Sequence, residues 1–375
     1  MVKINKIRYY NASWMKTEML GLALTRHGPH SDFITDLQAL FAVGDLVNCL
    51  GPINRLGHEF LYSFDSTPMP LYLDTAVKTF DEAALLTAHD LWKRAGNRRL
   101  GIFWSGGIDS TAAIVALART KQDWKSQLVV YTSPYAVEQE YPWFYHNILR
   151  DVEVVLKPYE QLTRSDYLNE IFQSDMMFTD GSCGDQCWNS MRLETIPESM
   201  WDQPWDKFFD TETFLTTVVS EQHDMVAAYI AQQRSRFPVD LKTVQDLYYM
   251  LTFSHRWDQV RYRTPLKSQN YSLILNIESF FQCFFDSFHF QRWSLTSVQS
   301  RNIKTWNQYK QSAKNFIYKF TKDPTYLGKP KIASGPATAQ YESIKPNLKT
   351  GKIMLVTDNG VKTMQGDLLE QSIKP

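Results

Sequence analysis

The sequence is short of cysteine, and the cysteines that it has are not arranged as metal ligands. Its 375 residues include four cysteines, with no CxxC pair and no Cys/His cluster at zinc-finger spacing. This spacing argues against a zinc-thiolate site. Cys183 and Cys187 lie close enough in the sequence to be bridged or catalytic, although two reduced thiols are the simpler interpretation.

Long apolar runs and an excess of charge of one sign are also missing. The first ten residues, MVKINKIRYY, lack the apolar centre of a signal peptide, and no run reaches the length of a membrane span. Lys and Arg number 40, Asp and Glu also number 40, and the zero net charge gives no general attraction to nucleic acid or to membranes. We therefore expect a cytoplasmic protein without a membrane partner, and a nucleic acid is the less favoured kind of partner because binding it would require a local basic patch.

The commonest nucleotide-binding motifs are absent, but another glycine-rich turn is present. There is no GxxxxGK[ST] loop, and no GxGxxG follows a strand-like run. Leu100–Thr120 reads LGIFWSGGIDSTAAIVALART. An apolar run of strand length leads into a turn of small residues, and apolar residues at helical spacing follow from Asp109 onward.

A strand, a glycine turn and the start of a helix together form an anion site. The first helical turn leaves backbone N–H groups unpaired, and the helix dipole adds positive charge there. Gly106 and Gly107 let the backbone approach a phosphate without a Cβ in the way. Ser105 and Ser110 can add hydroxyl donors, and Asp109 can hold the Mg²⁺ that accompanies a nucleotide.

This turn matches in full the SGGxDS loop, and the chain thereby resembles the PP-loop ATP pyrophosphatases. That family includes asparagine, GMP, NAD and argininosuccinate synthetases and tRNA-thiolating enzymes, which split ATP between the α and β phosphates and adenylate a substrate. The resemblance implies an α/β fold like that of the adenine nucleotide alpha hydrolases, with a parallel five-stranded sheet and helices on both faces. It also implies that ATP is bound by Ser105, Gly106, Gly107, Ile108, Asp109 and Ser110.

Strand-like and helix-like stretches alternate around this loop, which independently favours a parallel sheet. A helix is expected over Thr79–Ala95 and another over Tyr141–Arg150, with strands over Ser126–Thr132 and Val152–Leu156. Ligands of such sheets bind beyond the carboxyl ends of the strands. Further helices are expected over Asp32–Phe41, Tyr167–Ser174, Glu212–Phe237, Leu241–Thr252, Ser272–Phe288 and Ser300–Phe320.

The sequence suggests three consecutive segments. Residues 1–78 read as a small α+β region with strands over Ile4–Tyr10 and Phe60–Phe64. Residues 79–334 would form the PP-loop domain, which becomes largely helical toward its C-terminal part. Residues 335–375 form a tail in which Asp358-Asn359-Gly360 predicts a β-hairpin.

A second stretch with polar chemistry is Phe178–Trp188, FTDGSCGDQCW. Taken alone, its acids fit either a solvated Gly/Asp turn or a carboxylate that completes a magnesium site with Asp109. The asparagine-synthetase branch carries a GxGxDELF loop at about this place. Gly181, Asp185 and Trp188 match that pattern, and the departures are Cys183, Gln186 and Cys187. The resemblance implies that Asp109 and Asp185 hold the metal, with Gly181 at the pyrophosphate.

Three later segments resemble the branch more weakly. Ile277–Asp286 is similar to a VExRxPFLD segment and would make Glu278 catalytic, although its residues equally fit an aromatic core helix. Lys310–Lys319 is similar to a KxxLR helix, with Lys314 on its lysine. Gly328–Ser334 resembles an RxKxxF loop, which from its residues alone could be merely solvated. The resemblance makes Lys331 the catalytic lysine beside the phosphates, with Lys329 in place of the arginine.

These observations predict an ATP- and Mg²⁺-dependent ligase that adenylates a substrate, most simply a carboxylate, and then joins it to an amine. Asparagine synthetases begin with a glutaminase domain whose nucleophile is an N-terminal cysteine. Here position 2 is Val2 and the segment ahead of the loop is short for that domain, so we do not expect this chain to hydrolyse glutamine. The expected nitrogen source is free ammonia, a substrate amine as in β-lactam synthetases, or a partner protein that delivers nitrogen.

Two other interpretations remain open. The chain could adenylate a carbonyl oxygen of a nucleobase, for which Trp188, Trp201 and Trp205 offer stacking surfaces unless they are buried. It could also be an ATP- or AMP-binding protein without turnover, an interpretation supported by the degenerate Ile277–Asp286 segment.

Overall fold

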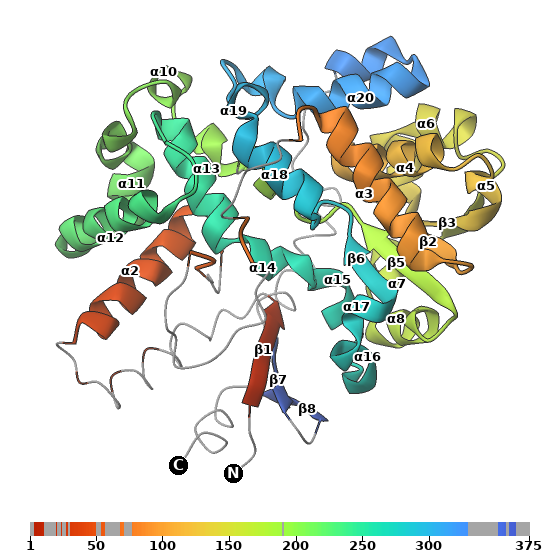
Figure 1. Cartoon of the computed structure of the whole chain (residues 1–375), viewed down its shortest axis with the longest axis horizontal. Coiled ribbons are helices and arrows are strands. Elements are labelled where there is room, and N and C mark those ends of the chain that lie inside the picture. Colours follow the sequence, from red (N-terminus) through yellow and green to blue (C-terminus); the bar gives the residue numbers. More distant parts are fainter. Residues whose placement is uncertain are drawn as a thin grey trace. The chain divides into compact units, whose positions relative to one another are not determined.

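A five-stranded sheet in which all neighbouring strands are parallel organises the middle of the chain, as predicted (Figure 1). The structure is a computed structural model, and it describes residues 4–10, 31–49, 54–56, 68–70, 77–189, 191–328, 352–357 and 360–364, with positions 20, 24 and 28. The strand order is β4-β3-β2-β5-β6. The strands are β2 Arg99–Trp104, β3 Leu128–Thr132, β4 Glu153–Leu156, β5 Met176–Asp180 and β6 Phe281–Cys283. Every residue of β3 is buried, as the continuous apolar run predicts for the interior of a parallel sheet.

The order of the strands reverses between β2 and β5. From β2 the chain builds outward to β3 and β4, and it then returns to the other side of β2 to add β5 and β6. Right-handed crossovers therefore place α4, Ile108–Thr120, and α8, Ser165–Phe172, on opposite faces. In open parallel sheets, ligands bind beyond the carboxyl ends of the strands at such a reversal. The loops that follow Trp104 and Asp180 flank this position.

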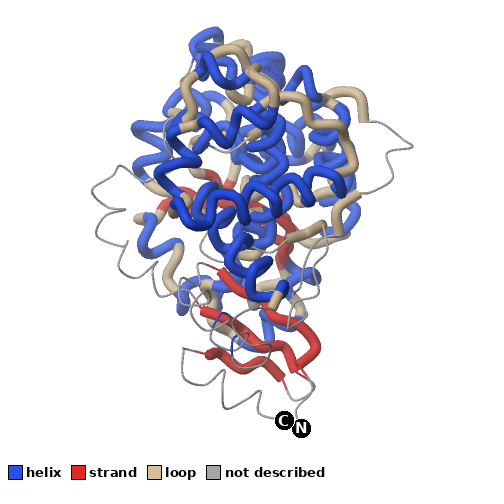
Figure 2. Tube along the Cα trace, turned by 90° about the vertical axis from the view of Figure 1, so that its left-hand side faces the viewer, coloured by secondary structure: helices blue, strands red, loops and turns tan. Residues whose placement is uncertain are grey.

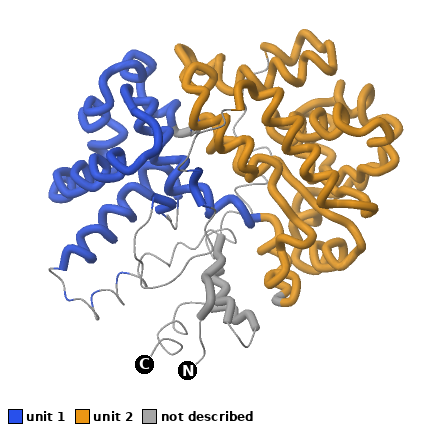
Figure 3. Tube along the Cα trace, in the orientation of Figure 1, with its two compact units in different colours: residues 1–71, 189–263, 343–375 blue, residues 72–188, 264–342 orange. Residues whose placement is uncertain are grey.

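The chain divides into two compact units (Figure 3). Residues 72–188 and 264–342 form the unit with the parallel sheet, and residues 1–71, 189–263 and 343–375 form the other. This division differs from the three consecutive segments that the sequence suggested, because residues 189–263 belong with the N-terminal region. Phe60–Phe64 lies outside the described residues.

Helices predominate among the described residues (Figure 2). In the unit that contains residues 189–263, α2, Asp32–Leu46, packs against three later helices. These are α11 Glu212–Thr217, α12 His223–Arg236 and α13 Val244–His255. The predicted strand β1, Ile4–Tyr10, pairs antiparallel with β7, Lys352–Thr357, and β7 pairs with β8, Gly360–Met364. The hairpin predicted at Asp358-Asn359-Gly360 is thus confirmed.

The remaining elements are short. In the unit with the sheet they are α5 Trp124–Gln127, the π-helical turn η1 Ala136–Glu140, α6 Pro142–Asn147, α7 Tyr159–Leu162, α9 Gly184–Trp188, α19 Val298–Arg301, η5 Trp306–Gln308 and η6 Pro324–Gly328. In the other unit they are η2 Met191–Thr195, α10 Glu198–Trp201, η3 Trp205–Asp210, η4 Ser220–Gln222 and α14 Trp257–Arg261. Helix α15, Arg263–Leu266, begins at the last residue of that segment and continues into the unit with the sheet. Within the described residues, no helix is long and apolar enough to span a bilayer.

The helix before β2 forms as its sequence predicts. In α3, Phe80–Ala95, the Thr79 side chain accepts a hydrogen bond from the Glu82 amide and caps the N-terminus. Gly96 ends the helix with a φ of 62°, a conformation that glycine adopts without steric cost. Local signals at both ends therefore sufficed to place this element.

A cluster of aromatic rings around Phe80 fixes the helices that surround the candidate loops. Phe80 lies 5.3–6.4 Å, centroid to centroid, from the rings of Trp188, Phe285, Phe290, Trp293 and Phe316. These rings come from α9, from the segment after β6, from α18, Phe288–Thr296, and from α20, Gln311–Thr321. Rings at these separations stabilise each other beyond the effect of their burial. The cluster joins α3 to each of these segments.

Three expected helices were wrong in extent. Ser272–Phe288 contains α16, Tyr271–Leu275, α17, Ile277–Phe280, and strand β6, whose Phe281 pairs with Phe178 of β5. Short apolar runs fit a strand or a helix equally well, and pairing with β5 decides between them. The helix expected over Glu212–Phe237 breaks where Val218 and Val219 are extended. The one expected over Ser300–Phe320 is divided into the end of α19, the turn η5 and α20.

We predict that Gly101→Ala destabilises the protein. A Cβ at this position in β2 would lie 2.6 Å from ring carbons of the fully buried Phe178 and 3.1 Å from the Tyr131 ring. Overpacking of this kind costs about 1–3 kcal/mol, more than alanine recovers by restricting the unfolded chain. Urea unfolding of the variant and the wild type measures this loss as a difference in the free energy of unfolding. Gly328→Ala is the matched control because its Cβ would meet nothing within 4 Å, and equal effects of the two substitutions would contradict the packing of β2.

Candidate functional site

The SGGIDS loop makes a tight turn between β2 and α4. Gly106 has a φ of 75°, and a Cβ there would lie 2.5 Å from the Cβ of Glu140 and 3.0 Å from the carbonyl oxygen of Ala136. The π-helical turn η1 therefore lies directly behind the loop. Only glycine satisfies both the backbone conformation and this close approach.

Hydroxyl groups of the loop hold its shape. The Ser110 hydroxyl accepts a hydrogen bond from the Ser105 amide at 3.1 Å and lies 3.1 Å from the Ser105 hydroxyl. The Thr111 hydroxyl accepts a hydrogen bond from the indole N–H of Trp104 at 3.0 Å. Gly107 is the N-cap of α4, and no side chain of the described residues caps this helix end. The positive end of the α4 dipole thus lies at the loop without a side-chain cap among the described residues.

The acidic loop after β5 uses its two aspartates differently. The Asp180 carboxylate accepts hydrogen bonds from the Ser182 amide at 2.9 Å, the Ser182 hydroxyl at 3.0 Å and the Thr264 hydroxyl at 2.7 Å. Asp180 is 6% exposed and shapes the loop. Asp185, in α9, instead contacts the ammonium of Lys310, which also contacts Asp109 of the SGGIDS loop.

Two glycines allow the acidic loop to lie against the start of α4. A Cβ on Gly181 would lie 2.7 Å from the Ser110 nitrogen, and one on Gly184 would lie 2.5–2.9 Å from the carboxylate of Asp109. Sequence analysis identified Gly181 but missed Gly184. Between them, Cys183 has a φ of 67° at the place of the second glycine of the GxGxDELF pattern. The left-handed backbone therefore persists without glycine, at a cost of about 1–2 kcal/mol.

The carboxylates of Asp109 and Asp185 converge on the ammonium of Lys310, a residue that sequence analysis did not select. Its Nζ donates to Oδ2 of Asp109 and lies 2.6 Å from Oδ1 of Asp185. The Lys310 side chain is 0% exposed. The Tyr309 hydroxyl also donates to Asp185 Oδ1, at 3.2 Å, and the Trp188 ring centroid lies 5.3 Å from Nζ. Lys310 thus joins both predicted loops through one charged group.

Electrostatics keeps this lysine charged despite its burial. Burial alone would lower the pKa of Lys310, but the charges and hydrogen bonds of Asp109 and Asp185 outweigh it and raise the pKa. Lys310 is also the N-cap of α20 and has a left-handed φ of 57°. Helix N-termini disfavour cations, and N-caps favour Ser, Thr, Asp or Asn. The one feature of the sequence that could have identified Lys310 is its position one helical turn before Lys314. The preferences of helix N-termini argue against choosing a lysine at that position.

Asp109 and Asp185 fit a magnesium ion that is bound together with phosphates. Mg²⁺ is commonly held by one or two carboxylates, with phosphates and water as its other ligands. Within the described part of the chain, no group of three or more His, Cys, Asp or Glu side chains is placed to hold a metal. A metal on the two aspartates would therefore depend on oxygens from a ligand, and it would share those aspartates with Lys310.

The other predicted residues are not gathered at this site. Glu278 lies in α17 ahead of β6, and Arg98, just before β2, donates to the neighbouring Ser279 carbonyl at 2.9 Å, so Glu278 lies at the amino ends of the strands. Lys314 is buried, and its Nζ donates to the carbonyl of Asn307 at 3.2 Å. Burial lowers its pKa. Lys329 and Lys331 lie outside the described residues.

The cysteines, Trp188 and Trp201 are buried in the core and are not placed to react with a ligand or to stack on one. All four cysteines are free and buried, and burial raises the pKa of the Cys187 thiol, which makes it a poor nucleophile. Trp188 and Trp201 are buried, and their indole N–H groups donate to the Ser312 hydroxyl and the Ile196 carbonyl. Neither ring is available for stacking on a base.

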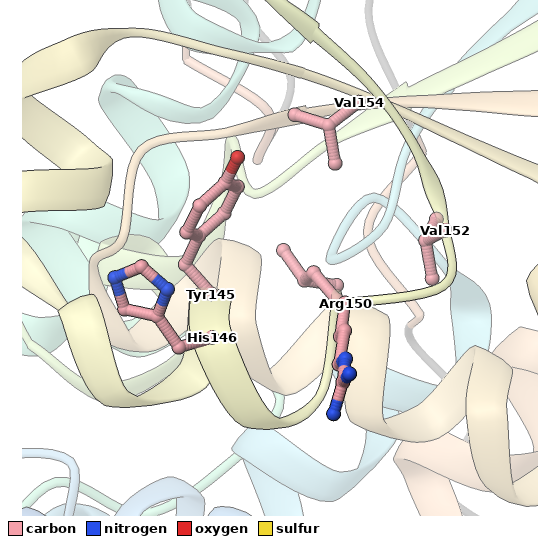
Figure 4. Close-up of a pocket in the computed structure, with 6 residues that line it drawn as sticks. Tyr145, His146, Arg150, Val152 and Val154 are labelled. Atoms are coloured by element: carbon pink, nitrogen blue, oxygen red, sulfur yellow. The ribbon is translucent and has the colours of Figure 1, made fainter.

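A pocket of about 370 Å³ lies beside α6 and β4 (Figure 4). It is lined by Tyr145, His146, Leu149, Arg150, Val152 and Val154. Arg150 is exposed, and its guanidinium points away from Val152 and Val154. The pocket therefore lacks the converging polar groups of a ligand site.

Comparisons with protein-family models and with curated protein sequences find no match to this chain. The features of this chain that bear on function are therefore the residues around the sheet reversal. Those residues are the SGGIDS loop, the acidic loop with Asp185, and Lys310.

The two adjacent glycines of the loop should respond differently to alanine. Gly106→Ala should lower the free energy of unfolding by about 2 kcal/mol, because a Cβ meets η1 and the positive φ disfavours alanine. Gly107 has a φ of −74°, and its Cβ would meet only the Ser105 hydroxyl oxygen, at 3.3 Å, so Gly107→Ala should change stability by less than about 1 kcal/mol. Urea unfolding of both variants measures the difference. Equal losses would contradict the loop geometry.

Proposed function

We propose that this chain is an ATP-dependent ligase that adenylates a carboxylate, releases pyrophosphate and forms an amide with an amine or ammonia. We further propose that its sheet domain has the adenine nucleotide alpha hydrolase-like fold. The observation that carries the proposal is the meeting of Asp109 and Asp185 where the strand order reverses. The SGGxDS resemblance supplies the type of reaction.

Phosphate binding is supported by the backbone as well as by side chains. The first turn of α4 has no side-chain cap among the described residues, and Lys310 brings the first turn of α20 beside it. Two helix N-termini give partial positive charge at the same place. Gly107 keeps the approach to these amides free of a Cβ.

In the proposed reaction, the loop residues Ser105 to Ser110 bind and orient the phosphates of ATP. Asp109 and Asp185 would hold Mg²⁺, which supplies charge neutralisation on the phosphate oxygens. A carboxylate oxygen of the substrate attacks the α-phosphorus and pyrophosphate leaves, after which the amine displaces AMP. By resemblance, Lys331 stabilises the charge that develops on pyrophosphate, and Lys329 assists it. Four free cysteines fit the reducing cytoplasm as the compartment.

A second candidate is a nucleotide-binding protein without turnover. The observation in its favour is Lys310, which already neutralises part of the charge on both proposed metal ligands. Adenylation of a nucleobase has less support, because Trp188 and Trp201 are buried and the guanidinium of Arg234 lies over the half-buried Trp205 ring.

Product analysis tests the proposal. Purified protein with MgATP and a pool of amino acids, small carboxylates and amines should release AMP and pyrophosphate in equal amounts, measured by chromatography and a coupled pyrophosphate assay. Release of ADP and phosphate would contradict it. Tight ATP binding without turnover on any pool would favour the second candidate, and pyrophosphate release only with RNA or DNA would favour nucleobase adenylation.

Asp109→Asn should reduce pyrophosphate release at least about a hundredfold, because a group at the site of charge development is lost. The variant keeps the size of the side chain and leaves Asp185 as a carboxylate partner of Lys310, so its unfolding curve should show a folded protein that is less stable than the wild type. Asp151→Asn is the matched control: Asp151 is exposed, pairs with Lys125 and follows α6 far along the chain from both loops. Activity retained by Asp109→Asn would remove Asp109 from the reaction.

A further inference from the structure

Lys310 occupies the point where the two proposed metal ligands meet. Its ammonium contacts Oδ2 of Asp109 and Oδ1 of Asp185, the latter at 2.6 Å. The carboxylates are 14% and 28% exposed, whereas the lysine is 0% exposed. The cation therefore approaches from the protein side, and the carboxylates retain some access to solvent.

We propose that Lys310 is a built-in cation that fills the metal position of the nucleotide-free protein, so that a divalent metal binds tightly only together with phosphate groups. The identity of those phosphates as ATP rests on the proposed function. The role of Lys310 toward the metal rests on the ion pairs alone.

A divalent metal without phosphate would meet two obstacles at this place. It would compete for carboxylate oxygens that already hold the ammonium, and the two cations would repel each other. If the metal displaced Lys310, a buried ammonium would lose its anions, which is among the costliest changes in a protein interior. The Trp188 and Tyr309 rings, 5.3 and 5.5 Å from Nζ, offer only weak compensation.

Phosphate groups remove both obstacles. Their oxygens supply the further ligands that Mg²⁺ requires and give the ammonium new anionic partners on the same side of the loop. Lysine has a flexible stem with rotatable donors, so its head group can shift by a short distance without the helix moving. Metal and phosphate ligand should therefore bind cooperatively, and by linkage each should strengthen the other by the same factor.

The test measures Mn²⁺ binding by electron paramagnetic resonance in the absence of nucleotide. Wild-type protein should bind Mn²⁺ weakly, and Lys310→Met should bind one Mn²⁺ about 5–150-fold more tightly, in the range of ordinary coupling between sites. Lys314→Met is the matched control, because Lys314 is a buried lysine of the same helix that contacts only the Asn307 carbonyl among the described hydrogen bonds. It should bind Mn²⁺ like the wild type. The double variant Lys310→Met/Asp185→Asn should lose the gain.

Wild-type protein provides an independent arm if Lys310→Met does not fold. Calorimetric titration with a non-hydrolysable ATP analogue should show tighter binding with Mg²⁺ than without it. Tight Mn²⁺ binding by nucleotide-free wild type that Asp185→Asn abolishes would overturn the proposal, as would equal Mn²⁺ affinities of wild type and folded Lys310→Met. If no analogue binds and Lys310→Met still gains Mn²⁺, the proposed function fails while the role of Lys310 stands.

Discussion

The burial of one ammonium between two carboxylates is the interaction on which the candidate site depends. Asp109 belongs to the start of α4, Asp185 to the loop after β5, and Lys310 to the start of α20. These segments are far apart in the sequence, and a buried charge that lost its partner would cost about 3–5 kcal/mol. The ion pairs therefore fix the mutual position of three segments at the reversal of the sheet. A purely apolar contact would tolerate small displacements of these segments relative to one another, which the ion pairs do not.

Aromatic packing around Phe80 holds in place the helices that carry the charged residues of the site. The Phe80 cluster joins α3 to α9, α18 and α20, and Trp188 belongs both to this cluster and to the surroundings of Lys310. Further from the site, Lys319 of α20 lies 2.9 Å from Asp81, and Arg119 of α4 lies over the Phe316 ring. Helix α20 is thus attached to α3 and α4 along its length. The backbone of Lys310, at the N-terminus of α20, can adopt a strained conformation because contacts farther along the helix, at Phe316 and Lys319, keep the helix in place.

Local signals predicted the elements whose ends are set by neighbouring residues. The Thr79 cap, the acids of the first turn and Gly96 placed α3, and the run from Leu100 to Thr120 placed β2, the loop and α4. Asp109 and Asp185 were paired by resemblance, and the structure brings their carboxylates together. Strand β6 was missed because its three residues are a strand only by pairing with β5. Lys310 was missed because the carboxylate that stabilises it at a helix N-terminus, that of Asp109, lies some two hundred positions earlier in the chain.

Two of the five described non-glycine residues with a left-handed backbone, Cys183 and Lys310, belong to segments that meet at the candidate site, whereas Asn48, Gln269 and Lys322 lie outside those segments. Cys183 has a glycine-like φ of 67° in the loop that carries Asp185, and Lys310 has a φ of 57° at an N-cap that should favour an acceptor. Each conformation costs about 1–3 kcal/mol, and tertiary packing must impose it. In these two segments the left-handed residue lies at or close to a member of the ion pair between Asp185 and Lys310, so the backbone cost accompanies the placement of the charged groups. The constraint on both is the same small volume next to the first turn of α4.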